Sequence, residues 1–129
     1  MKLDISNRED LVNLMKAFYT KALVDESIGH YFTQVVQLDM EKHLPRITDF
    51  WETVVFDVGK YQGNTMKIHE DLHEQSPFAS AHFTRWIDLF KATVDEHFAG
   101  ENAEKIKSRA ISIATVMNLK MVHGGAGLK

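Results

Sequence analysis

The sequence predicts an all-α protein built from four long helices and short connecting pieces. Apolar residues recur three or four positions apart, and no stretch alternates between apolar and polar side chains as a strand does. Glycine and proline are few, with 7 and 2 among 129 residues, and the glycines outside the C-terminal tail fall between the apolar-periodic stretches. A chain of this length suits one domain, so we expect a single domain over residues 1–129.

The first helix is predicted to follow a capping box, in which Ser6 is the N-cap and Glu9 lies three positions further on. Its apolar face is the stripe formed by Leu11, Leu14, Met15, Phe18, Tyr19 and Ala22. Residues 25–29 end this helix. The short apolar stretch over residues 31–38 then predicts a partial turn of helix.

A second long helix is predicted over residues 39–58. Its apolar face consists of Met40, His43, Leu44, Ile47, Phe50, Trp51, Val54 and Val55. Pro45 lies inside this pattern, and proline has no N–H to give to the preceding turn. We therefore expect the helix to be irregular or to begin near Lys42.

Between the second and third long helices, the chain is predicted to be broken into short pieces. Residues 59–65 are expected to form a loop, and residues 66–73 leave room for at most two turns of helix before Pro77. The third long helix is predicted to start at Ser80 and to end before Gly100. Its apolar face consists of Phe83, Trp86, Ile87, Phe90 and Val94.

The fourth long helix is predicted over residues 102–122. Its apolar face consists of Ala103, Ile106, Ala110, Ile113, Met117 and Met121. The tail over residues 123–129 is rich in glycine, and we expect it to be frayed because chain ends order only when they are tied down.

Composition and charge exclude several classes of protein. The formal net charge is −3, from 15 Lys and Arg against 18 Asp and Glu, so no basic excess indicates nucleic acid or an anionic membrane as a partner. The chain has no cysteine, which excludes disulfides, thiolate metal sites and cysteine nucleophiles. No apolar stretch resembles a secretory signal or approaches the ~20 residues of a membrane span. We therefore expect a cytoplasmic protein.

One short motif predicts a zinc site. His69, Glu70, Asp71, Leu72 and His73 fit the H-E-x-x-H pattern of zinc peptidases, in which two histidines share a helix face and the glutamate activates water. That chemistry needs a helix buried in a cleft and a third ligand beyond it, whereas this helix has at most two turns. A small zinc hydrolase therefore stays open as one alternative.

A looser constellation of aromatic residues and histidines indicates a different site. The predicted helices carry Phe18, Tyr19, His43, Ile47, Phe50, Trp51, Phe83, Trp86 and Phe90, and the short segment between them carries His69. Haem needs one neutral imidazole on its iron, an apolar slot around the macrocycle, and selected donors on the opposite face. The same stripe is also what an ordinary helical core looks like, so spacing alone leaves both interpretations open.

Four stretches then resemble a known family. Residues 43–51 resemble the distal-helix motif H-L-P-x-x-x-D-F-W of the group III truncated haemoglobins, and residues 61–69 resemble their motif Y-x-G-N-x-M-x-x-H. Residues 18–19 and 82–86 match the motifs of the family's first and third helices. The four matches follow the family's order at compatible spacings, and Pro45 is ordinary in that family.

The resemblance implies a truncated globin fold, in which two helices pack over two in a sandwich around haem b. His69 matches the residue that binds the haem iron on the proximal side, and it is the only metal ligand that the resemblance assigns. Tyr19, His43 and Trp86 match the polar positions on the opposite, distal side. The positions that line the pocket are matched by Phe32, Ile47 and Phe50.

The haem propionates need cations at the pocket edge, and Arg46 is the first candidate, since it lies about one turn from His43, with Lys67 second. The resemblance implies a protein that reversibly binds O₂ and the related gases NO and CO, with NO-detoxifying or peroxidase-like chemistry as a further role. Such chemistry requires a reductase, which the sequence does not identify. No residue is assigned as catalytic, and we expect a monomer.

Overall fold

The computed structural model describes residues 2–35, 37–57, 69, 73 and 78–124, and all the regular structure in this part of the chain is helical. The long helices are α1 (Arg8–Ala22), α2 (Met40–Phe56), α4 (Ser80–His97) and α5 (Glu101–Asn118). Two π-helical pieces, η1 (Tyr31–Val35) and η2 (Leu119–Gly124), complete the described elements. The predicted all-α class is therefore confirmed.

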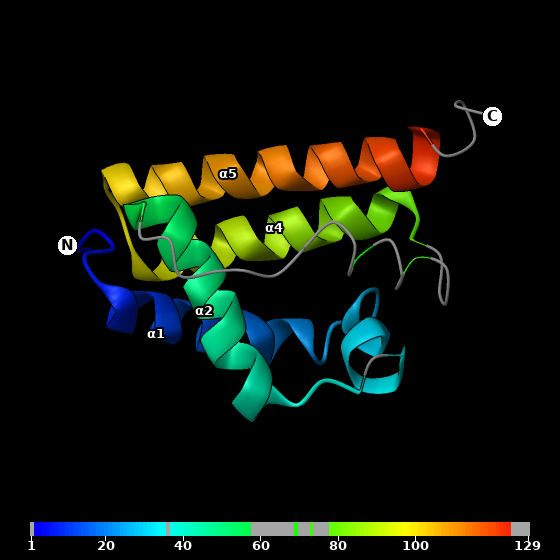
Figure 1. The fold of residues 1–129 in the computed structure, drawn as a ribbon, viewed down its shortest axis with the longest axis horizontal. Coiled ribbons are helices and arrows are strands. Elements are labelled where there is room, and N and C mark those ends of the chain that lie inside the picture. Colours follow the sequence, from blue (N-terminus) through cyan, green and yellow to red (C-terminus); the bar gives the residue numbers. More distant parts are fainter. Residues whose placement is uncertain (1, 36, 58–68, 70–72, 74–77, 125–129) are drawn as a thin grey trace.

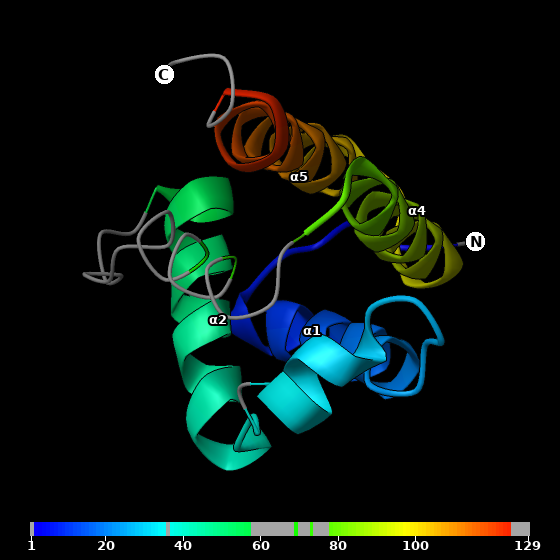
Figure 2. The ribbon, with the colours of Figure 1, turned by 90° about the vertical axis from the view of Figure 1, so that its right-hand side faces the viewer.

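The helices form two packed pairs. α4 and α5 run antiparallel side by side, while α2 crosses α1 at a steep angle (Figure 1). α1 packs on α2 and also on α4, and α2 packs on α5, so one pair lies over the other (Figure 2). Two helices over two is the arrangement that the resemblance to the truncated haemoglobins implies.

The core lies where α1 meets the other helices. All six residues of the predicted stripe on α1 are buried, and Phe18 is only 1% exposed. Phe90 of α4 lies between two indole rings, with Trp86 stacked on it at 5.2 Å and Trp51 of α2 stacked at 5.2 Å. This stack joins α2 to α4 through the centre of the molecule, and burial of such large rings is the main favourable term in folding.

The start of α1 differs from the prediction by one residue. The N-cap is Asn7 rather than Ser6, and its side chain accepts the N–H of Asp10 at 2.9 Å. The Asp10 carboxylate in turn accepts the N–H of Ser6 at 2.8 Å, so Asp10 takes the part that was predicted for Glu9. Asparagine is as good an N-cap as serine, and the local pattern alone does not decide between the two.

α2 begins at Met40, one residue after the predicted start at 39, and the alternative start near Lys42 is wrong. Asp39 caps the helix by accepting the N–H of Glu41 at 3.1 Å, and its carbonyl accepts the N–H groups of both Lys42 and His43 at 3.2 and 2.8 Å. These bonds hold the first turn without any contribution from Pro45, which lies inside the helix. Proline removes one donor, and a turn anchored by a cap tolerates that loss.

The remaining boundaries are close to their predictions. η1 confirms the partial helical turn, α4 starts at Ser80 as predicted, and α5 starts at Glu101, one residue early. η2 continues to Gly124, so the first two residues of the predicted frayed tail are helical, while residues 125–129 lie outside the described part. The predicted loop 59–65 also lies outside it.

α2 exposes part of its apolar face. It buries Thr48, Trp51, Glu52 and Val55, whereas the neighbouring apolar side chains Met40, Leu44, Ile47, Phe50 and Val54 are only half-buried against the core. The buried carboxylate of Glu52 is paired with Arg8 of α1 at 2.9 Å, which offsets the cost of removing its charge from water. Among the described helices, none is long and apolar enough to span a membrane.

Candidate functional site

The polar centre of the site is a hydrogen bond between α1 and α2. The phenol oxygen of Tyr19 lies 2.8 Å from Nε2 of His43, and the two rings meet edge to face at 5.1 Å. Tyr19 faces this way because it belongs to the buried stripe of α1, where it is 6% exposed. His43 reaches it from the second turn of α2, so helix packing brings together two groups that are 24 positions apart.

The electrostatic environment keeps both groups uncharged. Burial raises the pKa of Tyr19 far above its ordinary value, so the phenol stays protonated throughout the neutral range. Burial lowers the pKa of His43, and the charges of Arg46 and His69 lower it further. A neutral imidazole beside a protonated phenol can accept or donate one hydrogen bond at each ring nitrogen.

Trp86 is linked to Tyr19 by Phe18, which contacts both residues. The ring of Phe18 contacts both Tyr19 at 5.2 Å and Trp86 at 5.8 Å. Trp86 is half-buried and held flat on Phe90, at an interplanar angle of 12°. An indole fixed in this way has a defined direction for its N–H, the only polar group it has.

The predicted lining residues are half-buried apolar side chains. Phe32 packs edge to face on Tyr19 at 5.6 Å, while Ile47 and Phe50 follow His43 along α2. Each of the three rests against the core and keeps part of its surface uncovered. A large flat apolar group fits such a set, because covering this surface removes apolar area from water without disturbing the core behind it.

His69 lies outside the long helices, in a helical, half-buried position. Its charge is among those that lower the pKa of His43, so the structure brings the predicted proximal and distal imidazoles into one electrostatic environment. Its ring centroid lies 6.5 Å from that of Phe78. Arg46 is exposed, and its charge acts on the same histidine, which suits a cation at the rim; Lys67 lies outside the described residues.

The second histidine of the zinc motif is engaged elsewhere. Nδ1 of His73 accepts the backbone N–H of Phe78 at 2.8 Å. Within the described part of the chain, no three His, Asp or Glu side chains form a group that could hold a metal ion. Glu70 lies outside that part. The structure thus gives the zinc hydrolase alternative no third ligand among the residues it describes.

Phe78 is the residue near this site that the sequence analysis missed. It precedes Ala79, the N-cap of α4, and its ring packs on Phe83 in the first turns of that helix at 5.3 Å. This is the spacing of a hydrophobic staple, in which the residue before the N-cap contacts the fourth helical residue. Two phenylalanines five positions apart around a helix start were the available signal.

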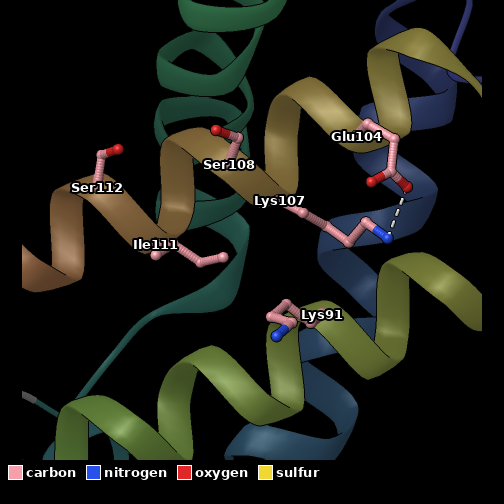
Figure 3. Close-up of a pocket in the computed structure, with 6 residues that line it drawn as sticks. All are labelled: Lys91, Glu104, Lys107, Ser108, Ile111 and Ser112. Carbon is pink, nitrogen blue, oxygen red and sulfur yellow. Dashed lines mark ion pairs between the residues drawn. The ribbon is translucent and has the colours of Figure 1, made fainter.

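A separate groove lies between α4 and α5. A pocket of about 360 Å³ is lined by Lys91, Glu104, Lys107, Ser108, Ile111 and Ser112, none of which belongs to the predicted site (Figure 3). Lys107 forms ion pairs with Glu104 at 2.8 Å and with Asp95 at 2.6 Å. With its carboxylate partners at hand, this lysine needs no ligand to balance its charge.

Comparison with known proteins gives the family. No family model matches the chain. The sequence is 30% identical over 129 residues to the group 3 truncated hemoglobin Ctb of Campylobacter jejuni. The aligned region covers 97% of this chain and 99% of that protein. The crystal structure of a group III truncated hemoglobin from Campylobacter jejuni matches with a TM-score of 0.84 at 28% identity, over 95% of this chain and 97% of the other.

These likenesses extend over nearly the whole of both chains, and they agree with the two-over-two packing of α1, α2, α4 and α5. They confirm the truncated globin fold that the motifs predicted. On sequence and fold together, this chain belongs to the group III truncated haemoglobins.

Proposed function

We propose that the protein binds haem b through His69 and reversibly binds O₂ and related diatomic gases on the side of Tyr19, His43 and Trp86. Haem supplies an iron centre that holds such gases, with His69 as its protein ligand. The observation that carries the proposal is the part-buried Tyr19–His43 hydrogen bond, which lies beside the half-buried apolar ring of Phe32 and, along α2, Ile47 and Phe50.

The donors of the pocket set how strongly it holds a gas. O₂ on ferrous haem draws negative charge onto its oxygen atoms, and a phenol O–H or an indole N–H stabilises that charge. Tyr19 and Trp86 are the two groups that fit this part, because burial keeps the phenol protonated and stacking on Phe90 holds the indole in place. Each such bond contributes about 1 kcal/mol, and up to ~3 kcal/mol when the acceptor is charged.

The apolar side chains have a different part. Phe32, Ile47 and Phe50 exclude water from the space beside the donors, and a dry pocket strengthens every hydrogen bond within it. Arg46, which is exposed on α2, is the cation that we propose for a haem propionate. In this proposal the same donors serve NO-detoxifying or peroxidase-like chemistry when an unidentified reductase supplies electrons. The protein itself is proposed to be cytoplasmic and to act as a monomer.

The test is an absorption spectrum of protein purified without added haem, in ferric, ferrous, oxy and CO forms, for wild type and His69→Ala. We expect a Soret band near one haem per chain in the wild type and its loss or severe weakening in His69→Ala. His97→Ala is the matched control, because His97 is an exposed histidine at the end of α4. Full haem occupancy with unchanged spectra in His69→Ala would remove the ligand assignment, and a colourless protein holding tight zinc would favour the hydrolase.

A further inference from the structure

Phe78 contacts four rings from three parts of the chain. Its ring stacks on His73 at 5.7 Å with an interplanar angle of 22°, and it lies 6.5 Å from His69. It also contacts Tyr31 of η1 at 4.7 Å and Phe83 of α4 at 5.3 Å. All four separations fall within the 4.5–7 Å range of interacting aromatic pairs. Phe78 therefore joins the segment that carries His69 to two elements of the main fold.

The backbone around Phe78 is held by two imidazoles. Its own N–H donates to Nδ1 of His73 at 2.8 Å, and the next N–H, of Ala79, donates to Nδ1 of His82 at 2.9 Å. Tyr31 also lies within reach of His82, with its phenol oxygen 3.2 Å from the same nitrogen. A nitrogen that accepts carries no proton, so both rings have the tautomer with hydrogen on Nε2.

His73 is well placed to pass this constraint on to His69. Both histidines have helical backbone, and the rings of both contact that of Phe78. His73 thus fixes the backbone N–H and the ring of Phe78, and the ring of Phe78 contacts His69. Phe83 of α4 and Tyr31 of η1 also pack on Phe78.

We propose that His73 and Phe78 are positioning residues, which fix the direction in which the imidazole of His69 points towards the haem iron. In this proposal His73, the second histidine of the H-E-x-x-H pattern, acts as a hydrogen-bond acceptor and not as a metal ligand. It rests on the proposed function, in which His69 binds haem. Groups that orient a metal-binding imidazole tune both the strength of its bond and the affinity for the metal centre.

A pair of substitutions separates the acceptor from the ring. His73→Phe keeps the stacking on Phe78 and removes the acceptor, while His73→Asn keeps an acceptor oxygen at the position of Nδ1 and removes the ring. The readouts are the iron–histidine stretching frequency of the ferrous protein and the rate of haem transfer to an excess of a haem-free acceptor globin. Neither depends on turnover.

We expect His73→Phe to shift the stretching frequency and to speed haem loss roughly five- to tenfold, the size of one lost hydrogen bond. His73→Asn should restore the frequency and most of the rate. Phe78→Leu, which keeps the N–H and removes the ring, provides a second test should His73→Phe fail to fold, and we expect it to shift the frequency too. His97→Phe, at an exposed position on α4, should change neither readout.

Unchanged frequency and haem loss in His73→Phe, with or without a lower melting temperature, would overturn the inference, since a merely structural part affects only stability. An equal shift in His73→Phe and His73→Asn would overturn it too, because the acceptor would then not matter. A wild-type protein that takes up no haem would instead contradict the proposed function. The two failures are therefore distinguishable.

Discussion

Tyr19 has one hydroxyl proton, and its partner decides where that proton goes. When Nε2 of His43 carries hydrogen, the imidazole donates to the phenol oxygen, and the O–H of Tyr19 stays available to another acceptor. When Nδ1 of His43 carries the hydrogen instead, the phenol O–H donates to Nε2 across the same 2.8 Å and is not available to another acceptor. The tautomer of one half-buried histidine thus decides whether the phenol O–H is available to a ligand in the proposed haem pocket.

Removing the hydroxyl tests this arrangement directly. Tyr19→Phe keeps the buried ring and deletes the donor, so we expect the O₂ dissociation rate to rise about fivefold to tenfold, and more if the acceptor is strongly charged. Stopped-flow displacement of O₂ by CO measures the rate.

Thr20→Ala is the control, because it removes an exposed hydroxyl at the next position of α1, which donates to the carbonyl of Lys16 at 2.8 Å. Its O₂ dissociation rate should equal that of the wild type. Equal rates in Tyr19→Phe and the wild type would remove Tyr19 from the set of ligand donors.

The connections between elements carry constraints of their own. Gly100 is the N-cap of α5 and has φ +143°, a backbone conformation that other residues rarely adopt. The side chain of Asp4 lies where a Cβ at this position would be. That carboxylate accepts the N–H groups of Asn102 and Ala103 at 3.0 and 2.9 Å, so the N-terminal arm caps α5.

Gly100→Ala is expected to destabilise the fold by about 1–3 kcal/mol, because alanine is strained at this φ and its methyl group displaces the Asp4 cap. The urea midpoint of unfolding should fall with the slope of the transition unchanged. The reference substitution is Ala99→Gly at the exposed neighbouring position, which changes chain flexibility without a collision. A midpoint for Gly100→Ala as high as that of the wild type would mean that the turn accommodates a side chain.

At the scale of the whole molecule, carboxylates join segments that are distant in sequence. The cap formed by Asp4 connects the N-terminal arm to α5, and Asp25 holds Arg85 of α4 at 2.6 Å. Burial pushes the pKa of Asp4 up, but the backbone N–H groups of Asn102, Ala103 and Ile5 outweigh it and leave the pKa below its ordinary value. The guanidinium of Arg85, with further help from backbone N–H groups, lowers the pKa of Asp25.

These shifts predict the direction of the acid response. A carboxylate with a lowered pKa binds its proton less readily in the folded state than in the unfolded chain. Its contribution to stability is therefore complete above the ordinary carboxyl pKa of about 3.9 and is lost as the pH falls through the folded value. We expect the free energy of unfolding, measured in urea, to decrease as the pH falls below about 4.

Asp4→Asn, which cannot ionise, should flatten part of that decrease, whereas Glu26→Gln at an exposed turn position should leave the profile as it is in the wild type. A profile of Asp4→Asn that runs parallel to the wild type down to the lowest pH would contradict the part given to Asp4.

The sequence by itself determined the helices and the inner face of α1, because caps and apolar spacing act within a few residues of one another. It also carried the motifs of the family, including His69 and the residues around His43. What only the tertiary structure decided was which part of the apolar face of α2 is buried in the core, and the contacts between Tyr19 and His43 and between Phe78 and Tyr31. The physical reason is that burial and hydrogen bonding between segments depend on how helices pack, and no local pattern encodes that packing.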